Sequence, residues 1–304
     1  MERDTFIIAV FCCIADLTPI LMGTKPLRKG GFSPQLTDAE VITIEICGEF
    51  LKLSTDKDIF QYFYSHYRHF FPQLTERTLF VRQAANLWVI KQQLWQLLVR
   101  LSGEDHAPVH CIDTLPIPVC RFARGCRERC LQGVADYGYC AAQKTHYYGF
   151  KGGLRISAHG MIVGCGLFNA RGHDANYTEE LIDNYQGIIA ADKGFLDVAY
   201  QEALQKTGVY LITPVCSNMK KPWYSHLLKP LMRMRHLIET VNAQLNERFA
   251  IGRIRVRDLW HFQHRFMRKI LAHTCAVFIN LVLGRQPLDS TDSSNKCRNV
   301  RHII

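Results

Sequence analysis

Three acidic residues in this sequence stand where carboxylates could hold divalent metal ions. Asp113 ends the apolar stretch 109–112, Asp192 ends a second apolar stretch, 187–191, and Glu239 lies in a segment with helical character. A carboxylate at the end of a buried strand is costly in free energy unless a positive charge lies beside it. Carboxylate oxygens are the ligands that Mg²⁺ and Mn²⁺ prefer. The three residues together therefore predict a metal site.

The chemistry of such a site is phosphoryl transfer. Two divalent ions about 3.5–4 Å apart can activate a water or a 3′-hydroxyl and stabilise the leaving oxygen. We expect Asp113 to bridge both ions, Asp192 to contact both, and Glu239 to complete the second site. A single surface Asp is usually only solvated, but two of them at the ends of core strands are hard to explain without a counter-ion. The pattern predicts an enzyme that cuts or joins nucleic acid.

Composition agrees with a nucleic-acid partner. The chain has 304 residues, 48% of them hydrophobic, and a formal charge of +10. A catalytic core with an additional unit fits this length. Clustered Lys and Arg gain free energy by releasing counterions from phosphates, so the charge favours a polyanionic partner without proving one.

The twelve cysteines do not indicate a secreted protein, because they are too dilute for a disulfide scaffold in a chain of this length. The apolar stretch Phe6–Ala15 is short for a signal peptide, and its flank carries mixed charge. The longest candidate for a membrane span, Ile270–Leu283, is too short and is interrupted by His273 and Asn280. We expect a cytoplasmic protein with free thiols and no membrane partner.

Four of the cysteines lie in a basic stretch and raise a separate zinc hypothesis. Cys120, Cys126, Cys130 and Cys140 could supply four thiolates to a tetrahedral site. Their spacing lacks the close Cys-x₂-Cys pairs that such sites usually have. Both interpretations stay open, with free thiols favoured.

The first hundred residues have helical patterns. Capping signals at Thr37–Glu40 and Thr55–Asp58 begin two helices, and Glu76–Leu101 has apolar residues at helical spacing. The loop 102–108 breaks the pattern. We therefore predict an all-helical N-terminal domain over residues 1–105, serving either as a helix-turn-helix reader of DNA or as a packing or dimerisation unit.

Beyond this loop the pattern changes to strands. A strand ends at Asp113, after which Pro116 and Pro118 are expected to interrupt regular pairing. The later elements are a hairpin with its turn at His159-Gly160, a short helix, the strand 188–192, a helix near 196–206, the strand 209–213 and the helix of Glu239. This order predicts an α/β fold, a mixed sheet flanked by helices, over residues 106–285. We expect the polar tail 286–304 to be disordered.

At four segments the chain resembles the DDE-superfamily transposases of bacterial insertion sequences. These segments are Cys111–Pro116, Tyr147–Lys151, Ala190–Phe195 and Arg235–Thr240, with Phe249 beyond. The resemblance implies an RNase H-like fold with Asp113, Asp192 and Glu239 as the catalytic triad and Mg²⁺ (or Mn²⁺) as cofactor. It also implies cleavage at terminal inverted repeats, transfer of the 3′-hydroxyl into target DNA, and a homo-oligomer on DNA.

Two positions depart from the pattern of these transposases. Met232 stands where a Tyr is common and Asn246 where a Lys is common, although the spacing of Arg235 and Glu239 is kept. Arg248 or Lys229 could supply the missing positive charge. The departures leave open two alternatives: an RNase H-like nuclease without strand transfer, and a DNA-binding relative that has lost catalysis.

Several basic residues are candidates for DNA contact. Arg253, Arg255 and Arg257 alternate, so an extended segment would point all three one way as a phosphate-binding stripe. For His173-Asp174, between a strand and a helix, a turn or a cap is favoured over DNA contact. The full set of predicted DNA-binding residues is Lys151, Lys220, Lys221, Arg235, Arg253, Arg255 and Arg257.

Overall fold

The computed structural model describes residues 2–22, 33–141, 143–214 and 228–289. Two units are formed, and neither is continuous in sequence. The helical unit comprises Met1–Leu98, Arg248–Ala250 and Trp260–Ile304, and the sheet unit comprises Val99–Glu247 and Ile251–Leu259. The predicted domain boundaries at residues 105 and 285 stay a prediction. The two units are drawn from contacts in space, and they group residues 260–289 with the N-terminal helices. Of the predicted disordered tail, residues 290–304 lie outside the described residues.

The helical unit forms where the capping signals place it. Its helices are α1 (Arg3–Met22), α2 (Asp38–Phe50), α3 (Asp56–His66), α4 (Arg77–Asn86), α5 (Trp88–Ser102) and α9 (Leu259–Val282). Thr37 and Glu40 form the capping box of α2, and Thr55 caps α3 by accepting from the Asp58 amide. The predicted helix 76–101 is interrupted at Leu87, where the backbone leaves helical geometry at φ −90° and ψ 9°.

Helix α1 is longer than the apolar stretch in the sequence suggested, because Pro19 does not end it. Its buried residues Ile7, Val10, Ile14 and Leu17 recur at helical spacing and form one face. Among the described helices, α1 alone is long and apolar enough to cross a membrane, with a mean hydropathy of 1.9 over residues 3–21. A core helix or a signal sequence has the same composition, so this is weak evidence for a membrane segment.

A network of buried ion pairs joins α2, α3 and α9 inside the helical unit. The Arg268 side chain is fully buried and donates to Glu49 over 2.6 Å, to Asp56 over 2.7 Å and to Glu45 over 3.2 Å. Lys269, also buried, donates to Glu49 over 2.6 Å. Charges are tolerated at such depth only when they are paired and hydrogen-bonded. The network therefore fixes which faces of these helices meet.

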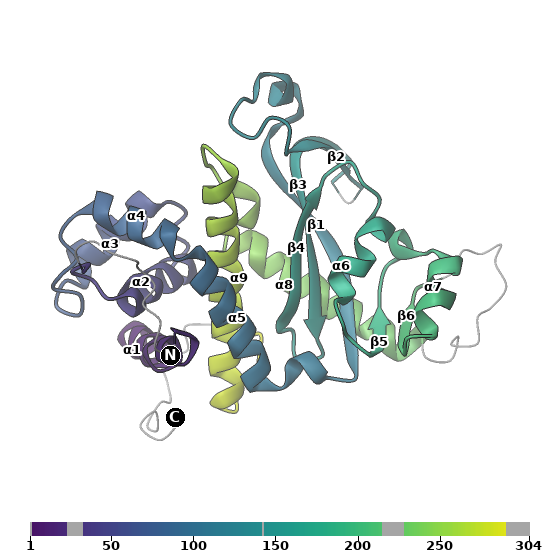
Figure 1. Cartoon of the computed structure of the whole chain (residues 1–304), viewed down its shortest axis with the longest axis horizontal. Helices are drawn as coiled ribbons and strands as arrows, with labels where there is room; N and C mark the ends of the chain where they lie inside the picture. The colour runs from purple at the N-terminus through teal and green to yellow at the C-terminus, as the bar shows by residue number, and fades with distance from the viewer. Residues whose placement is uncertain (1, 23–32, 142, 215–227, 290–304) are drawn as a thin grey trace. The chain divides into compact units, whose positions relative to one another are not determined.

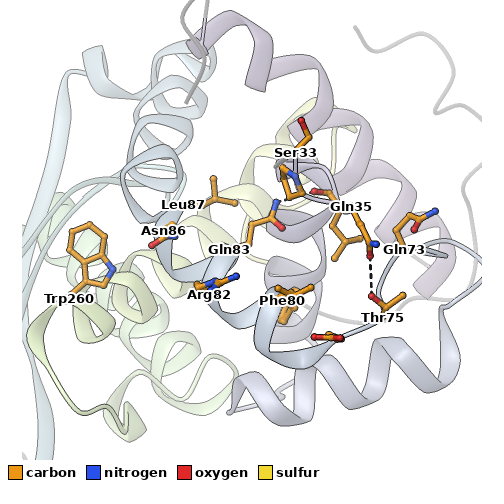
Figure 2. Close-up of a pocket in the computed structure, with 14 residues that line it drawn as sticks. Ser33, Gln35, Gln73, Thr75, Phe80, Arg82, Gln83, Asn86, Leu87 and Trp260 are labelled. Atoms are coloured by element: carbon orange, nitrogen blue, oxygen red, sulfur yellow. Dashed lines mark hydrogen bonds between the residues drawn. The ribbon is translucent and has the colours of Figure 1, made fainter. Parts of the chain in front are cut away.

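The helical unit also contains a cavity of about 770 Å³. Figure 2 shows the side chains of Gln83, Arg82 and Asn86 from α4, with Trp260 of α9 at one side and the hydrogen-bonded pair Gln35 and Thr75 at the other. All of its lining residues belong to the helical unit. None of the predicted site residues lines this cavity.

The sheet unit is a mixed sheet flanked by helices, which confirms the predicted α/β fold class (Figure 1). Its regular elements are β1 (Val109–Arg121), β2 (Asp136–Cys140), β3 (Thr145–Ser157), β4 (Ile162–Asn169), α6 (Thr178–Ile182), β5 (Gly187–Ala190), α7 (Val198–Gln205), β6 (Val209–Ile212) and α8 (Leu228–Glu247). The strand order is β4–β3–β1–β5–β6, antiparallel from β4 to β1 and parallel from β1 to β6. β2 pairs with the first part of β3.

The predicted interruption of β1 after Asp113 is wrong. β1 stays paired with β3 through Pro116 and Pro118, and the register shifts only between Pro118 and Cys120. The two prolines are two residues apart. Backbone N–H groups alternate between the two edges of a strand, so the N–H groups that the prolines lack lie on the same edge. β5 pairs with β1 only over Val109–Cys111, so within the described sheet no strand lies beside the rest of that edge. Proline is tolerated at such an edge.

Opposite faces of the sheet are covered by different helices. Ile112 joins a buried cluster with Leu181 of α6, Ile189 and Phe195, whereas α8 packs against β1 and β5. Because side chains alternate along a strand, Cys111 and Asp113 point away from this cluster. Asp113 therefore lies on the side of the sheet where α8 packs.

Candidate active site

The first two carboxylates come from neighbouring parallel strands. β1 and β5 pair in register, with Cys111 opposite Ala190. Asp113 and Asp192 each follow two residues later, so they stand at matching positions where the two chains leave the pair. Parallel strands direct their carboxyl ends to the same edge of a sheet. The prediction that Asp192 follows the end of a core strand is confirmed. The same prediction is wrong for Asp113, which lies inside β1, two residues beyond the point where the pairing with β5 ends.

Helix α8 supplies the third carboxylate and two polar side chains from the same face. Arg235, Glu239 and Asn242 are spaced by four and three residues, which aligns them on a helix. The Asn242 amide donates to Asp113 Oδ2 over 2.9 Å. Arg235 Nη1 lies 3.3 Å from Asp192 Oδ1, and Arg235 Nη2 lies 3.9 Å from Glu239 Oε1. One helix thus contacts both strand ends.

Asp113 is the least exposed of the three carboxylates, because it is half-buried whereas the side chains of Asp192 and Glu239 are exposed. Burial raises its pKa to about 6, and the neighbouring carboxylates of Asp174 and Asp192 act in the same direction. The Thr114 amide, which donates to Asp113 Oδ1 over 2.8 Å, and the charge of Arg235 act against the rise. A half-buried carboxylate that faces other carboxylates is stabilised in its charged form by a cation.

The three carboxylates lie in the same region of the fold, but they are not arranged as the ligands of a single metal ion. In the part of the chain that the structure describes, no three His, Cys, Asp or Glu side chains are arranged to hold one metal ion. The Arg235 guanidinium lies between Asp192 and Glu239 and neutralises both. The donor set itself, oxygen ligands only, has the chemistry that Mg²⁺ and Mn²⁺ require.

Asp174 begins a 3-10 helix (Asp174–Tyr177) after His173, as the favoured turn or cap predicted, and its side chain also belongs to this site. Its Oδ1 accepts from Thr114 Oγ1 over 2.9 Å and from Lys151 Nζ over 2.9 Å. A Cβ at Gly194, two residues after Asp192, would lie 2.9 Å from Asp174 Oδ2, so the segment after Asp192 approaches Asp174 closely. No spacing signal in the sequence distinguishes Asp174, because its partners come from three separate segments.

The predicted DNA-binding residues have different surroundings. Lys151, expected at DNA phosphate, donates to Gly172 O over 2.7 Å and pairs with Asp174. The predicted extended stripe is wrong for Arg253, which ends a 3-10 helix (Ile251–Arg253), although all three stripe arginines are exposed. Lys220 and Lys221 lie outside the described residues, as do the side chains of Lys229 and Met232. Asn246 is exposed, and Arg248 donates to Phe50 O inside the helical unit.

The four cysteines of the zinc hypothesis are free thiols. Cys120 and Cys140 are half-buried, and Cys126 and Cys130 are exposed. The described residues contain no cluster among them that could hold a metal ion. Zinc binding by this loop is thus not supported by the structure.

Comparison with known families decides the class of the protein. The sequence model of the transposase DDE domain matches residues 104–259, just over half of the chain and including all three carboxylates. The chain belongs to the DDE transposase family. A cryo-EM structure of the piggyBac transposase synaptic complex with hairpin DNA is similar to this DDE transposase at 11% identity and a TM-score of 0.46. That alignment covers 95% of this chain and 77% of the other. The curated proteins give no match.

Proposed function

We propose that this DDE transposase cleaves DNA strands at the ends of a bacterial insertion sequence and transfers the freed 3′-hydroxyl into target DNA. The observation that carries the proposal is the pairing of β1 with β5. It sets Asp113 and Asp192 side by side, while Arg235 and Asn242 of α8 connect them to the helix of Glu239. Polynucleotidyl transfer is the chemistry that such a carboxylate set supports.

The cofactor we propose is Mg²⁺ or Mn²⁺, held by Asp113, Asp192 and Glu239. The raised pKa of Asp113, caused by burial and by neighbouring carboxylates, fits a group that is completed by a cation. When bound, such ions supply activation of the attacking oxygen and stabilisation of the leaving oxygen.

The protein's own residues would position these groups. Asn242 fixes one oxygen of Asp113 and the Thr114 amide fixes the other. Asp174 accepts from the Thr114 side chain and is itself held by Lys151, so this pair would position the part of β1 next to Asp113. Arg235 is placed to contact the scissile phosphate once its carboxylate partners are neutralised, because a guanidinium matches phosphate geometry.

DNA binding would rest on exposed basic side chains. Arg253, Arg255 and Arg257 are exposed in the sheet unit, and we propose that they contact phosphates near the active site, together with Lys220 and Lys221. We assign Lys151 to positioning rather than to phosphate. A cytoplasmic location and assembly as a homo-oligomer on DNA belong to the same proposal.

The test is an assay that separates cleavage from joining. The purified full chain is incubated with labelled duplex carrying the element end and with unlabelled target DNA, in Mg²⁺ or in EDTA. A transposase yields a cleaved strand and a longer, joined product in Mg²⁺ only. Cleavage without the joined product would instead identify a nuclease, and binding without cleavage would identify an inactive relative. Inverted repeats flanking the coding region would support the insertion-sequence origin.

A further inference from the structure

The sheet unit carries an extension that the proposed active site does not use. We define the distal arm as residues 121–141 and 143–146: the end of β1, the 3-10 helix Phe122–Arg127, β2 and the start of β3. In Figure 1 the segment that joins β1 to β2 projects above the labelled strands of the sheet. The arm contains five basic and two acidic residues, a formal charge of +3.

One face of the arm is a row of aromatic rings. In the β2–β3 register, Tyr137 lies opposite Tyr148 and Tyr139 lies opposite His146. The Phe122 ring centroid is 5.1 Å from that of Tyr137 and 5.4 Å from that of His146. Phe122, Tyr137 and Tyr139 are still 50%, 39% and 51% exposed. Neighbouring aromatic side chains that stay this exposed on a projecting ribbon mark a binding surface.

The same arm presents arginines without acidic partners. Arg121, Arg124, Arg127 and Arg129 are all exposed. Within the described ranges none of them lies within ion-pair distance of an acidic side chain. Glu128 lies among them, but its carboxylate accepts from the Cys130 amide. The arm therefore offers unpaired positive charge beside exposed rings.

We propose that the distal arm is a second DNA-binding site, which holds DNA beyond the point of cleavage. Arginines would contact phosphates, and the exposed rings would stack on unpaired bases, because every base has a face that can stack whatever its sequence. The charge argues against a second copy of the arm as partner, since two arms of this charge repel each other. The inference rests on the proposed function, because it takes DNA as the substrate.

The position of the arm predicts how far from the active site it would contact DNA. Arg121 is eight residues along β1 from Asp113, which is about 26 Å at about 3.3 Å per residue. DNA running along the strand would meet the arm about eight base pairs from the active site, at about 3.4 Å per base pair. Contacts of the arm should thus fall outside the immediate site of cleavage.

The experiment measures binding of the full chain to two labelled DNAs by fluorescence anisotropy over a range of salt. One DNA is a duplex and the other is a fork of the same length with unpaired arms. Arg124→Ala with Arg127→Ala should lower the salt slope by about two, since each lost phosphate contact changes it by about 0.9. Phe122→Ala with Tyr139→Ala should weaken binding to the fork by about tenfold or more, and binding to the duplex much less.

Lys206→Ala, an exposed basic residue at the end of α7, is the matched control and should leave the slope unchanged. Circular dichroism checks that each variant is folded. If the arm variants bind both DNAs with the same affinity and salt slope as the wild type, the arm proposal is wrong and the proposed function is untouched. No binding by the wild type would instead overturn the proposed function. Arm variants that change the mass in light scattering but bind DNA normally would identify a protein interface and also reject the proposal.

Discussion

Asn242 donates its side-chain amide to Asp113 Oδ2 over 2.9 Å, a bond between residues 129 positions apart. It ties the helix that carries Glu239 to the strand that carries Asp113. Glu239 lies one turn before Asn242 on the same face of α8. The bond therefore helps to set the separation of two proposed metal ligands.

Asn242→Ala should slow cleavage without preventing folding. The substitution removes the donor that orients Asp113, and loss of a hydrogen bond to a metal ligand typically costs about 10- to 100-fold in activity or metal affinity. Single-turnover cleavage in Mg²⁺ checks this. Asn246→Ala, one turn further along the same helix and exposed, is the control and should cleave at the wild-type rate. If Asn242→Ala and Asn246→Ala cleave at equal rates, Asn242 does not position Asp113 for catalysis.

Asp174→Ala should also reduce cleavage, because the Thr114 hydroxyl loses its acceptor and Lys151 loses its carboxylate partner. We expect a loss of about tenfold in rate, at the lower end of what such supporting bonds contribute. Cleavage is compared with Glu180→Ala, an exposed acidic residue on α6. A rate for Asp174→Ala no lower than that control would show that the network does not support Asp113.

The sequence predicts the two strands that carry Asp113 and Asp192 more fully than it predicts the surroundings of the carboxylates. Asp113 and Asp192 could be identified because each follows a run of apolar residues, a local signal that a buried strand leaves in the sequence. Asp174 and Asn242 leave no such signal. Their role arises from contacts between segments 60 and 129 residues apart, which only the tertiary fold brings together.

The errors in the predicted fold have the same origin. Pro116 and Pro118 predict an interruption when they are judged as isolated residues, yet they lie on an edge of β1 that needs no donor. The break at Leu87 falls inside a continuous apolar pattern. For the prolines the partner of the strand, and not its own composition, decides the structure, whereas nothing in the structure explains the break at Leu87.

Arg268→Ala should strongly destabilise the helical unit. It removes the cation that three buried carboxylates share, and breaking a buried ion pair typically costs about 3–5 kcal/mol. Urea unfolding followed by circular dichroism measures the loss. The exposed Arg82→Ala should change the unfolding free energy by less than about 0.5 kcal/mol. A similarly small change for Arg268→Ala would mean that the network contributes little to stability.

The sheet unit should lose stability in mild acid through His110. This side chain is fully buried and stacks on Tyr185; its Nε2–H donates to Glu104 O over 2.9 Å, and Nδ1 has no hydrogen-bond partner among the described residues. Burial lowers its pKa to about 4 from 6.5. The unfolded state therefore binds the proton more readily, and stability present above pH 6.5 is lost as the pH falls towards 4.

Between pH 7 and pH 5 the loss from His110 should be about 2 kcal/mol, since each unit of pKa difference corresponds to about 1.36 kcal/mol. Urea unfolding at the two pH values measures it, and His110→Gln isolates the contribution of this residue from that of the carboxylates. The variant should show a smaller difference between the two pH values than the wild type. An identical difference would show that His110 is not the titrating group.

The central claim, that Asp113, Asp192 and Glu239 form one metal-dependent catalytic site, is tested most directly by single-turnover cleavage of end DNA in Mg²⁺. The variants are Asp113→Asn, Asp192→Asn and Glu239→Gln, which keep the shape of each side chain but remove the charge that holds a cation. We predict that each variant abolishes cleavage while binding DNA with wild-type affinity, because binding rests on Lys and Arg. Cleavage at the wild-type rate by any of the three would contradict the account.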